Sequence, residues 1–388
     1  MSTDYKELLK SYKGKKVLVT GNTGFKGSWL TYILLSAGAD VCGYSLKPST
    51  DPNLFEIAGL DKNPHLKQVY GDVRDLDALK KAFAEFKPEF VLHLAAQPIV
   101  RDSYKDPVNT YSTNVMGTVN ICECVRLSAT EKSAGGFKEA GYDGVKSFLN
   151  VTTDKVYKNN EIDYGYKEDD PLDGYDPYSN SKSCSELVTH SYNSSFLKDL
   201  SISVSTARAG NVIGGGDFSN DRIIPDCVRA LMNGMKENAP AVIGVRNPYS
   251  TRPYQHVLEP LFAYLMIAMK QYDDPSFAGY YNVGPDDCDC VNTGDLVTMF
   301  TDSWNRSKAD KLPKISWENR SEANAPHEAN FLKLDCAKLK KVFDWMPGWH
   351  IGEAVLETVN WTNARLSGKD ILEEMDSEIA RYVDHRTT

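Results

Sequence analysis

The stretch that decides the fold is Lys16-Val-Leu-Val-Thr20, which runs without a break into Gly21-Asn-Thr-Gly24-Phe-Lys-Gly27. The first five residues predict a buried strand, and the glycines predict a tight turn that opens into a helix at about residues 28–36. Glycines at such a turn let backbone amides approach a diphosphate, whose charge is stabilised by the N-terminus of the helix. The stretch therefore predicts a dinucleotide site, with candidate contacts at Gly21, Thr23, Gly24, Phe25 and Gly27.

The following residues repeat an alternation of short apolar runs and longer helical patterns. This alternation is typical of βαβ units and of a parallel sheet. We expect strands at residues 39–44, 66–70, 90–94, 147–152, 202–206 and 280–283. We expect helices at residues 76–86, 106–128, 177–197 and 257–269, and an acidic amphipathic helix in the tail. The fold class is therefore α/β, with a Rossmann-type doubly wound parallel sheet and a smaller C-terminal α/β substrate lobe.

The regular alternation ends after Arg208, where three consecutive glycines and several prolines follow. Residues 12–208 are therefore assigned to the dinucleotide-binding domain, with a return segment at about 256–284. Residues 209–255 and 285–365 are assigned to the lobe that binds the second ligand.

Composition excludes several classes of protein. The net charge of −9 should repel nucleic acid, and no apolar run is long enough to cross a membrane. The first residues lack the apolar core of a secretory signal. The eight cysteines are scattered, and the pairs Cys122/Cys124 and Cys288/Cys290 have a spacing that does not suit a zinc knuckle. We expect reduced thiols, no metal site and a cytoplasmic location.

Further cofactor contacts are expected where the strands end, because that edge of a doubly wound sheet binds the ligand. Asp72 and Val73 follow the third strand and suit an adenine amino group, and Asn114 is placed to brace the fourth strand. The second strand ends at Ser45, without the acidic residue that normally binds an NAD ribose, and nearby Lys47 is a signal for NADP. Small side chains after the fourth strand let the backbone lie against a ribose: Leu94, Ala95, Ala96 and Gln97. Taken singly, each of these residues also fits a plain loop or cap.

Tyr178-Ser-Asn-Ser-Lys182 places a phenol and an ammonium on one helical face. A neighbouring cation lowers the pKa of a tyrosine from about 10 toward a range in which it serves as a base. The fifth strand ends in Thr152-Thr-Asp-Lys155, so the hydroxyl of Thr153 is expected beside Tyr178. The alternative for the pair is a solvated helix face that begins with a cap.

The chain resembles the CDP-glucose 4,6-dehydratases of the extended short-chain dehydrogenase/reductase superfamily. The wider glycine spacing and the Tyr-Lys pair match the superfamily, and the triplet Thr153-Asp-Lys155 is more specific. The likeness covers about residues 15–368. It includes Ala207-Arg-Ala-Gly-Asn-Val-Ile-Gly-Gly-Gly-Asp217, Arg252-Pro-Tyr-Gln-His-Val-Leu-Glu-Pro260 and His327-Glu-Ala.

This resemblance implies an NAD-dependent lyase that converts CDP-glucose to CDP-4-keto-6-deoxyglucose and water through transient NADH and a 4-keto intermediate. It implies that Tyr178 takes the proton of the C4 hydroxyl with the help of Thr153, while Lys182 tunes Tyr178. It further implies that Asp154 protonates the departing O6 and that Lys155 takes the C5 proton. Related dehydratases that act on dTDP-sugars carry Glu at the position of Lys155, so Lys155 is either a base or a positioning residue. Burial and Lys182 should lower the pKa of Lys155, and burial should raise that of Asp154.

The nucleotide end of the substrate requires cationic donors. Of the arginines between Gly214 and His256, we expect Arg222 and Arg252 to bind the diphosphate, whereas Arg229 and Arg246 suit surface ion pairs. The expected substrate contacts are Asn211, Arg222, Arg252 and, as a weaker candidate, His256. The resemblance also implies a homodimer or homotetramer. The alternatives are another NAD-dependent nucleotide-sugar enzyme on the same scaffold (an epimerase, a decarboxylase or a different dehydratase) and a non-catalytic dinucleotide sensor.

Overall fold

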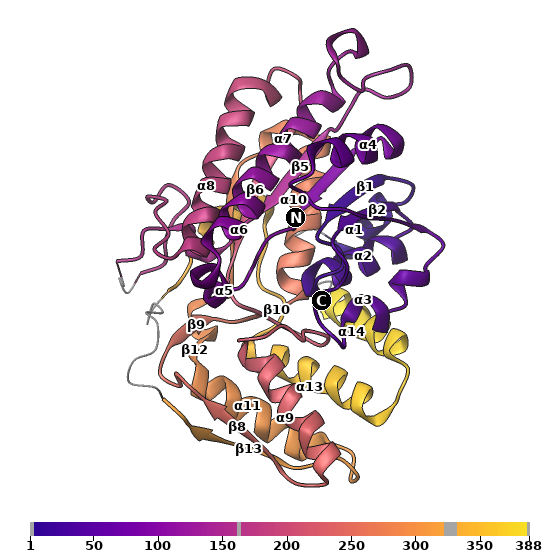
Figure 1. Cartoon of the computed structure of the whole chain (residues 1–388). Helices are drawn as coiled ribbons and strands as arrows, with labels where there is room; N and C mark the ends of the chain where they lie inside the picture. Colours follow the sequence, from indigo (N-terminus) through magenta and orange to yellow (C-terminus); the bar gives the residue numbers. More distant parts are fainter. Residues whose placement is uncertain (1–3, 161–163, 322–331, 386–388) are drawn as a thin grey trace.

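Seven parallel strands form the central sheet of the computed structural model, which describes residues 4–160, 164–321 and 332–385 (Figure 1). The spatial order of the strands is β3-β2-β1-β4-β5-β6-β11, so the order reverses beside β1. The bounds are β1 (Lys16–Thr20), β2 (Asp40–Ser45), β3 (Leu66–Tyr70), β4 (Phe90–His93), β5 (Ser147–Val151), β6 (Ser203–Ala209) and β11 (Tyr280–Val283). The predicted Rossmann-type sheet, including the return strand at 280–283, is confirmed. His327 lies outside the described residues.

Helices cover both faces of the sheet, because side chains on successive strand residues point to opposite faces. Val17 and Val19 of β1 join one core cluster and Leu18 joins the other. The first face is covered by α1 (Tyr5–Ser11), α2 (Phe25–Ser36), α10 (Leu258–Asp273) and α14 (Ile371–His385). The second face is covered by α4 (Leu76–Phe86), α7 (Gly117–Ser128) and α8 (Pro177–Tyr192).

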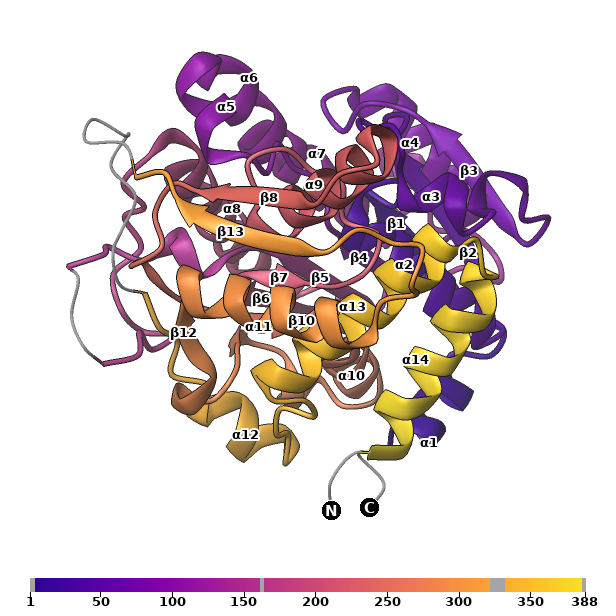
Figure 2. The same ribbon diagram turned by 90° about the horizontal axis from the view of Figure 1, so that it is seen from below.

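The lobe has its own apolar core below the carboxyl edge of the sheet (Figures 1 and 2). Its two main strands pair in parallel and are packed by three helices. These elements are β8 (Ala241–Val245), β13 (Ile315–Asn319), α9 (Ile223–Glu237), α11 (Thr293–Ser307) and α13 (Ile351–Ser367). Short pairs join the lobe to the sheet: β7 (Val212–Ile213) with β10 (Gln255–His256), and β9 (Thr251–Pro253) with β12 (Cys290–Asn292). The short helix α12 (Ala337–Phe343) packs on β11.

Two helix predictions differ from the structure in detail. The helix expected at 106–128 comprises α6 (Pro107–Tyr111), a π turn (Ser112–Met116) and α7. The helix expected at 177–197 is α8, followed by a second π turn (Asn193–Leu197). A π turn inserts one residue without interrupting the apolar pattern, so periodicity does not reveal it.

The acidic tail helix is α14, which returns to the sheet beside the N-terminal helix. Tyr382 of α14 packs on Tyr5 and Phe262, and Lys6 pairs with Asp384. The first and last helices, α1 and α14, therefore lie side by side (Figure 2). Among the helices within the described ranges, none combines the length and apolar character that a bilayer crossing requires.

Candidate active site

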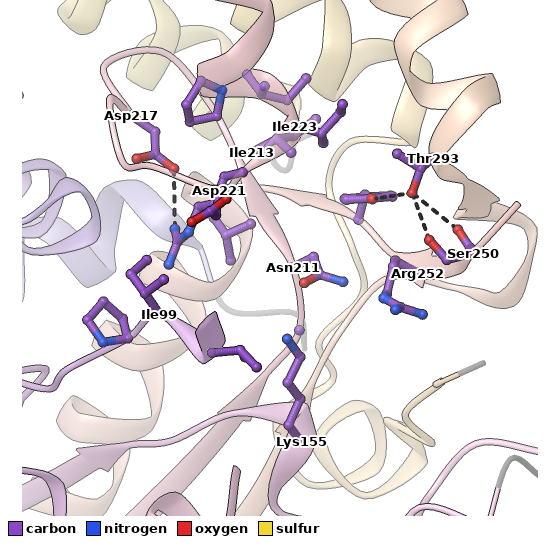
Figure 3. Close-up of a pocket in the computed structure, with 18 of the residues that line it drawn as sticks. Ile99, Lys155, Asn211, Ile213, Asp217, Asp221, Ile223, Ser250, Arg252 and Thr293 are labelled. Atoms are coloured by element: carbon purple, nitrogen blue, oxygen red, sulfur yellow. Dashed lines mark hydrogen bonds and ion pairs between the residues drawn. The ribbon is translucent and has the colours of Figure 1, made fainter. Parts of the chain in front are cut away.

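A cavity of about 290 Å³ opens where the carboxyl edge of the sheet faces the lobe (Figure 3). One wall consists of Thr152–Lys155 after β5 and Tyr178 on α8. The opposite wall consists of the segment from Gly210 to α9 together with β8 and β9. The cavity therefore lies at the edge where α/β sheets of this topology bind ligands.

The glycine-rich turn between β1 and α2 is packed so tightly that two of its positions require glycine. Gly21 has a φ of +71°, and a Cβ there would lie 2.8 Å from Cα of Ala95. A Cβ at Gly27 would lie 2.1 Å from the carbonyl oxygen of Gly21. Gly24 is the N-cap of α2 and supplies no side-chain cap, so the first amides of the helix are available to an anion.

The turn is tied to the end of β2 by hydroxyl groups. Thr23 and Ser45 are buried, with their oxygens 2.6 Å apart, and Thr23 also donates to the carbonyl of Leu46. At the end of β3, the carboxylate of Asp72 accepts hydrogen bonds from Arg74, and this contact lowers the pKa of Asp72. The side chain of Val73 is buried against Gly117. Asp72 therefore shares its carboxylate with Arg74 before any adenine approaches.

Asn114 holds the loop that follows β4. Its side chain accepts a hydrogen bond from the amide of Gln97 (2.8 Å) and donates to the carbonyl of the same residue (3.1 Å). Its amide also donates to Ser181 of α8 (2.9 Å). Asn114 lies in the π turn, which places it to reach both partners. The small side chains of Ala95 and Ala96 are thus presented on a fixed backbone.

The triplet after β5 forms a short turn at the cavity. Thr153 donates to one carboxyl oxygen of Asp154 (2.8 Å) and Asp154 is 1% exposed. Burial raises the pKa of Asp154, although the positive charge of Lys155 opposes this effect. Lys155 is half-buried and extends into the cavity (Figure 3). The turn therefore presents a carboxyl group with a raised pKa beside an amine.

Tyr178 and Lys182 lie on the inner face of α8, as expected from their spacing. Burial raises the pKa of Tyr178 to about 12, although a hydrogen bond with Thr153 and the charge of Arg222 both act to lower it. Lys182 donates to the carbonyl of Val151 (3.1 Å), and burial lowers its pKa to about 8. The expected lowering of the Tyr178 pKa toward neutrality is therefore wrong for this arrangement, because burial outweighs the neighbouring charges.

The lobe contributes Asn211, Arg222 and Arg252 to the cavity, as predicted. The amide nitrogen of Asn211 is buried without a hydrogen-bond partner within the described residues. Arg222 pairs with Asp217 (3.2 Å), and Arg252 is 8% exposed. Asn211 and Arg252 both point into the cavity (Figure 3).

His256 does not line this cavity, so its prediction as a substrate contact is corrected. The imidazole is fully buried, with Nε2 3.0 Å from a carboxyl oxygen of Glu378 and its ring against Trp349. Burial lowers the pKa of His256 to about 4. Glu378 lies on α14, far along the chain, and nothing in the sequence pattern links the two residues.

The cavity contains cations that the sequence prediction missed. Lys26 of the glycine-rich turn is half-buried there, and burial together with Arg222 and Lys182 lowers its pKa to about 7. The sequence signal that could have identified Lys26 is its position between Gly24 and Gly27 of the glycine-rich turn. Arg246, expected as a surface ion pair, does pair with Asp221 (3.1 Å) but also lines the cavity, as does Arg101.

The metal-donor side chains of Cys288, Asp289 and His350 lie together at the start of α13. Asp289 accepts from the amide of Ile351 and contacts His350 at 2.9 Å. The carboxylate of Asp289 therefore caps the N-terminus of α13, which explains why these side chains lie together.

The parallel sheet, the glycine-rich turn and the Tyr178–Lys182 pair define a short-chain dehydrogenase/reductase of the extended type. The chain belongs to the GDP-mannose 4,6-dehydratase family, whose model matches residues 18–358. It is 43% identical to the CDP-glucose 4,6-dehydratase of Salmonella typhimurium over 382 residues, which cover 97% of this chain and 98% of the relative.

Solved structures share the fold at lower identity. A dTDP-glucose 4,6-dehydratase from Streptomyces venezuelae, with NAD bound, superposes with a TM-score of 0.70 at 23% identity, covering 92% of this chain and 99% of the other. A UDP-glucose 4-epimerase from Thermus thermophilus, in complex with NAD, gives a TM-score of 0.69 at 23% identity, covering 89% and 98%. Since dehydratases and epimerases match equally well, this likeness defines the fold alone.

Proposed function

We propose that the chain is an NAD-dependent CDP-glucose 4,6-dehydratase that forms CDP-4-keto-6-deoxyglucose and water. One observation carries the proposal: the triplet Thr153–Lys155 and Tyr178 line one cavity, whose opposite wall bears arginines, and Lys182 is anchored one helical turn from Tyr178 at the end of β5. The identity to the Salmonella enzyme over nearly the whole of both chains supports the choice of CDP-glucose.

The residues around the glycine-rich turn fit NAD. Gly21 and Gly27 allow the backbone of the turn to pack too closely for any side chain, and the uncapped amides of α2 suit a diphosphate. Thr23 of the glycine-rich turn and Ser45 at the end of β2 would face the adenosine ribose, while Asp72 and Val73 would face the adenine. When bound, NAD would accept a hydride from C4 of the sugar and later return it to C6.

The first step requires removal of the proton from the C4 hydroxyl. Tyr178 takes this proton, and Thr153 holds the substrate oxygen beside it. With a pKa of about 12, Tyr178 is a weak base at neutral pH, so positive charge must stabilise the phenolate, and the charge of Arg222 acts in this direction. Lys182 is anchored on Val151 and holds its ammonium at the end of β5.

The elimination requires an acid for O6 and a base for C5. Asp154 is suited to the role of acid, because burial favours its protonated form. Lys155 takes the C5 proton, which the C4 ketone has made acidic, and it reaches into the same cavity. Asp154 and Lys155 are adjacent in the chain and line the same cavity. The acid for O6 and the base for C5 would therefore act on neighbouring carbons of the sugar.

The diphosphate of the substrate would lie against the lobe. Arg222 and Arg252 offer guanidinium donors, and the unpartnered amide of Asn211 offers another donor between them and the triplet. Arg222 would exchange its contact with Asp217 for the phosphate oxygens.

A 4-epimerase is the competing function, since epimerases share the fold. An epimerase needs only the redox step at C4, whereas Asp154 supplies an acid that this step does not use. Incubation with CDP-, dTDP-, GDP- and UDP-glucose, with and without added NAD, tests the choice. Loss of one water from CDP-glucose supports the proposal, and an isomer of unchanged mass contradicts it.

The assembly and location form part of the same proposal. Four exposed apolar side chains lie on the adjoining helices from α6 to the π turn after α8: Val108, Met116, Leu187 and Phe196. A twofold pairing of these helices would cover them and give a homodimer, or a homotetramer with a second contact. All eight cysteines are free thiols and five are buried, which is consistent with the cytoplasm.

A further inference from the structure

Three consecutive residues at the end of β5 each contact one residue of α8. The carbonyl of Val151 accepts from Lys182 at 3.1 Å. The hydroxyl of Thr152 donates to the carboxylate of Glu186. Thr153 and Tyr178 line the same cavity, and the hydroxyl of Thr153 acts to lower the pKa of Tyr178. Since Tyr178, Lys182 and Glu186 are spaced by four residues, they share one face of the helix, and β5 fixes that whole face.

Glu186 is the point at which α8 is joined to two strands. Besides Thr152 from β5, its carboxylate accepts from the hydroxyl of Thr206 (2.8 Å) and from the guanidinium of Arg208 (2.9 Å), both on β6. Arg208 also donates to the hydroxyl of Tyr157 and to the carbonyl of Glu168. The side chains of Glu186 and Arg208 are 1% and 3% exposed, so the pair is removed from solvent.

Such a pair is not explained by stability alone. The desolvation of two charges costs several kcal/mol, and apolar residues of similar volume often serve a fold as well or better. The pair instead fixes geometry. A carboxylate that accepts from three donors is held in one position relative to β5 and β6. That position determines where Thr153 and Asp154 lie relative to Tyr178.

We propose that Glu186 is a positioning residue of the reaction: it holds the register between the triplet after β5 and the Tyr178–Lys182 pair, and it keeps a negative charge beside Lys182. The proposal rests on the proposed function for the roles of Tyr178 and Lys182. Glu186 touches neither substrate nor cofactor and acts through the residues that do.

The other titratable groups near Lys182 are poorly suited to supply a negative charge beside it. Lys26 on α2 is a cation with a lowered pKa and His93 on β4 has a pKa lowered to about 3, so neither supplies negative charge. Asp154, after β5, has a raised pKa, and Tyr178, on α8, is a neutral phenol at pH 7. Burial lowers the pKa of Lys182 to about 8, and Glu186 acts in the opposite direction. Glu186 therefore favours the charged form of Lys182.

The experiment compares three variants. Glu186→Gln removes the charge but leaves Arg208 unpaired, so the double variant Glu186→Leu/Arg208→Met removes both charges and preserves packing. The control Thr189→Val removes a buried hydroxyl one turn further along α8, where Thr189 accepts from Asn150. It perturbs the contact between α8 and β5 without changing a charge.

Two quantities are measured: turnover of CDP-glucose as a function of pH, and the pKa of Lys182 from NMR of ¹³Cε-labelled lysine, assigned with Lys182→Arg. We expect both Glu186 variants to lower the Lys182 pKa by about one unit, to move the alkaline limb of kcat to lower pH and to lower kcat at least about tenfold. Thr189→Val should leave the pH profile and the Lys182 pKa unchanged.

A double variant with the Lys182 pKa and the pH profile of the unaltered protein would overturn the proposal. So would a Thr189→Val variant that reproduces the shift, because the effect would then be one of packing. If the unaltered protein turns over none of the nucleotide sugars, the proposed function fails, and the NMR arm still decides whether Glu186 controls the charge of Lys182.

Discussion

The hydroxyl of Thr153 donates a 2.8 Å hydrogen bond to one carboxyl oxygen of Asp154, and the second oxygen, also buried, has no partner within the described residues. A buried carboxylate oxygen without a donor is costly, whereas a carboxylic acid leaves an O–H that points to a ligand. The raised pKa of Asp154 agrees with this arrangement. In the folded protein, Asp154 is thus prepared to donate a proton.

Asp154→Asn should therefore abolish dehydration while cofactor reduction persists. The amide still accepts from Thr153 but cannot protonate O6, so formation of the 6-deoxy product should fall by about 10² to 10⁴. In the unaltered protein, product formation should decline as pH rises through the raised pKa of Asp154. Product analysis by NMR, with absorbance of the reduced cofactor, measures both steps. Loss of cofactor reduction in the variant would instead assign Asp154 to binding.

The same substitution should stabilise the fold at neutral pH. Because the folded-state pKa of Asp154 is raised, its contribution to stability is complete below the unfolded pKa of about 4 and is lost as pH rises through the folded pKa. The variant should therefore melt at a higher temperature than the unaltered protein at pH 7, with a smaller difference at about pH 4. Equal melting temperatures at pH 7 would contradict this prediction. They would mean that the ionised carboxylate of Asp154 is solvated well enough to offset the cost of its burial.

Cofactor preference should be NAD over NADP, with weaker binding of NAD than is usual for the fold. The end of β2 offers Ser45, already bonded to Thr23, in place of a carboxylate, and the missing contact is worth about 1–3 kcal/mol. Lys47 is exposed near this position and is the group that would attract a 2′-phosphate. Titration of both cofactors against the protein and against Lys47→Glu tests this. Tighter binding of NADP than NAD would contradict the prediction.

The sheet was predictable because its strands are short, apolar and bounded by turn residues. The segments 66–70 and 280–283 were placed correctly even though β11 lies far from β6 in the chain, since the alternation of elements implies one parallel sheet. The π turn at Ser112–Met116 was not predictable, because an extra residue within a helix does not change its composition. That turn nevertheless positions Asn114 against the loop that follows β4.

The site was predictable where its residues share a local motif. Tyr178 and Lys182 lie on one helix, and Thr153–Lys155 follow one strand, so their spacing carried the information. The error at His256 has a different origin: its partner Glu378 belongs to the tail helix, and only the fold brings the two together. The direction of Lys182 toward Val151 is likewise a tertiary contact that helical spacing does not reveal.

The protein should be at least a homodimer that pairs through the helices from α6 to the π turn after α8. Leu187 is 54% exposed on α8, and replacing it with Glu would place a charge in the apolar contact. Leu187→Glu should therefore reduce the mass measured by light scattering at micromolar concentration. The control Leu356→Glu alters a similarly exposed leucine on α13 of the lobe and should leave the mass unchanged. A monomeric mass for the unaltered protein would contradict the prediction.

Lys155→Met should separate oxidation of the sugar from loss of water. Lys155 extends into the cavity beside Asp154, and as the base at C5 it takes no part in the first hydride transfer. The variant should still form reduced cofactor and the 4-keto sugar, but release of the 6-deoxy product should fall by about 10² to 10⁴. Exchange of the C5 proton with deuterated solvent should slow by a similar factor, because that exchange needs the same base.

Tyr178→Phe is the matched control for Lys155→Met, since it removes the base of the first step and should block cofactor reduction as well. Both side chains line the same cavity, so the loss of either one alters its shape. A difference in cofactor reduction between the two variants therefore reflects their chemical roles. Normal C5 exchange and turnover in Lys155→Met would mean that another group takes the proton. Loss of cofactor reduction in Lys155→Met would mean that Lys155 positions the substrate, because a base needed only at C5 cannot affect hydride transfer from C4.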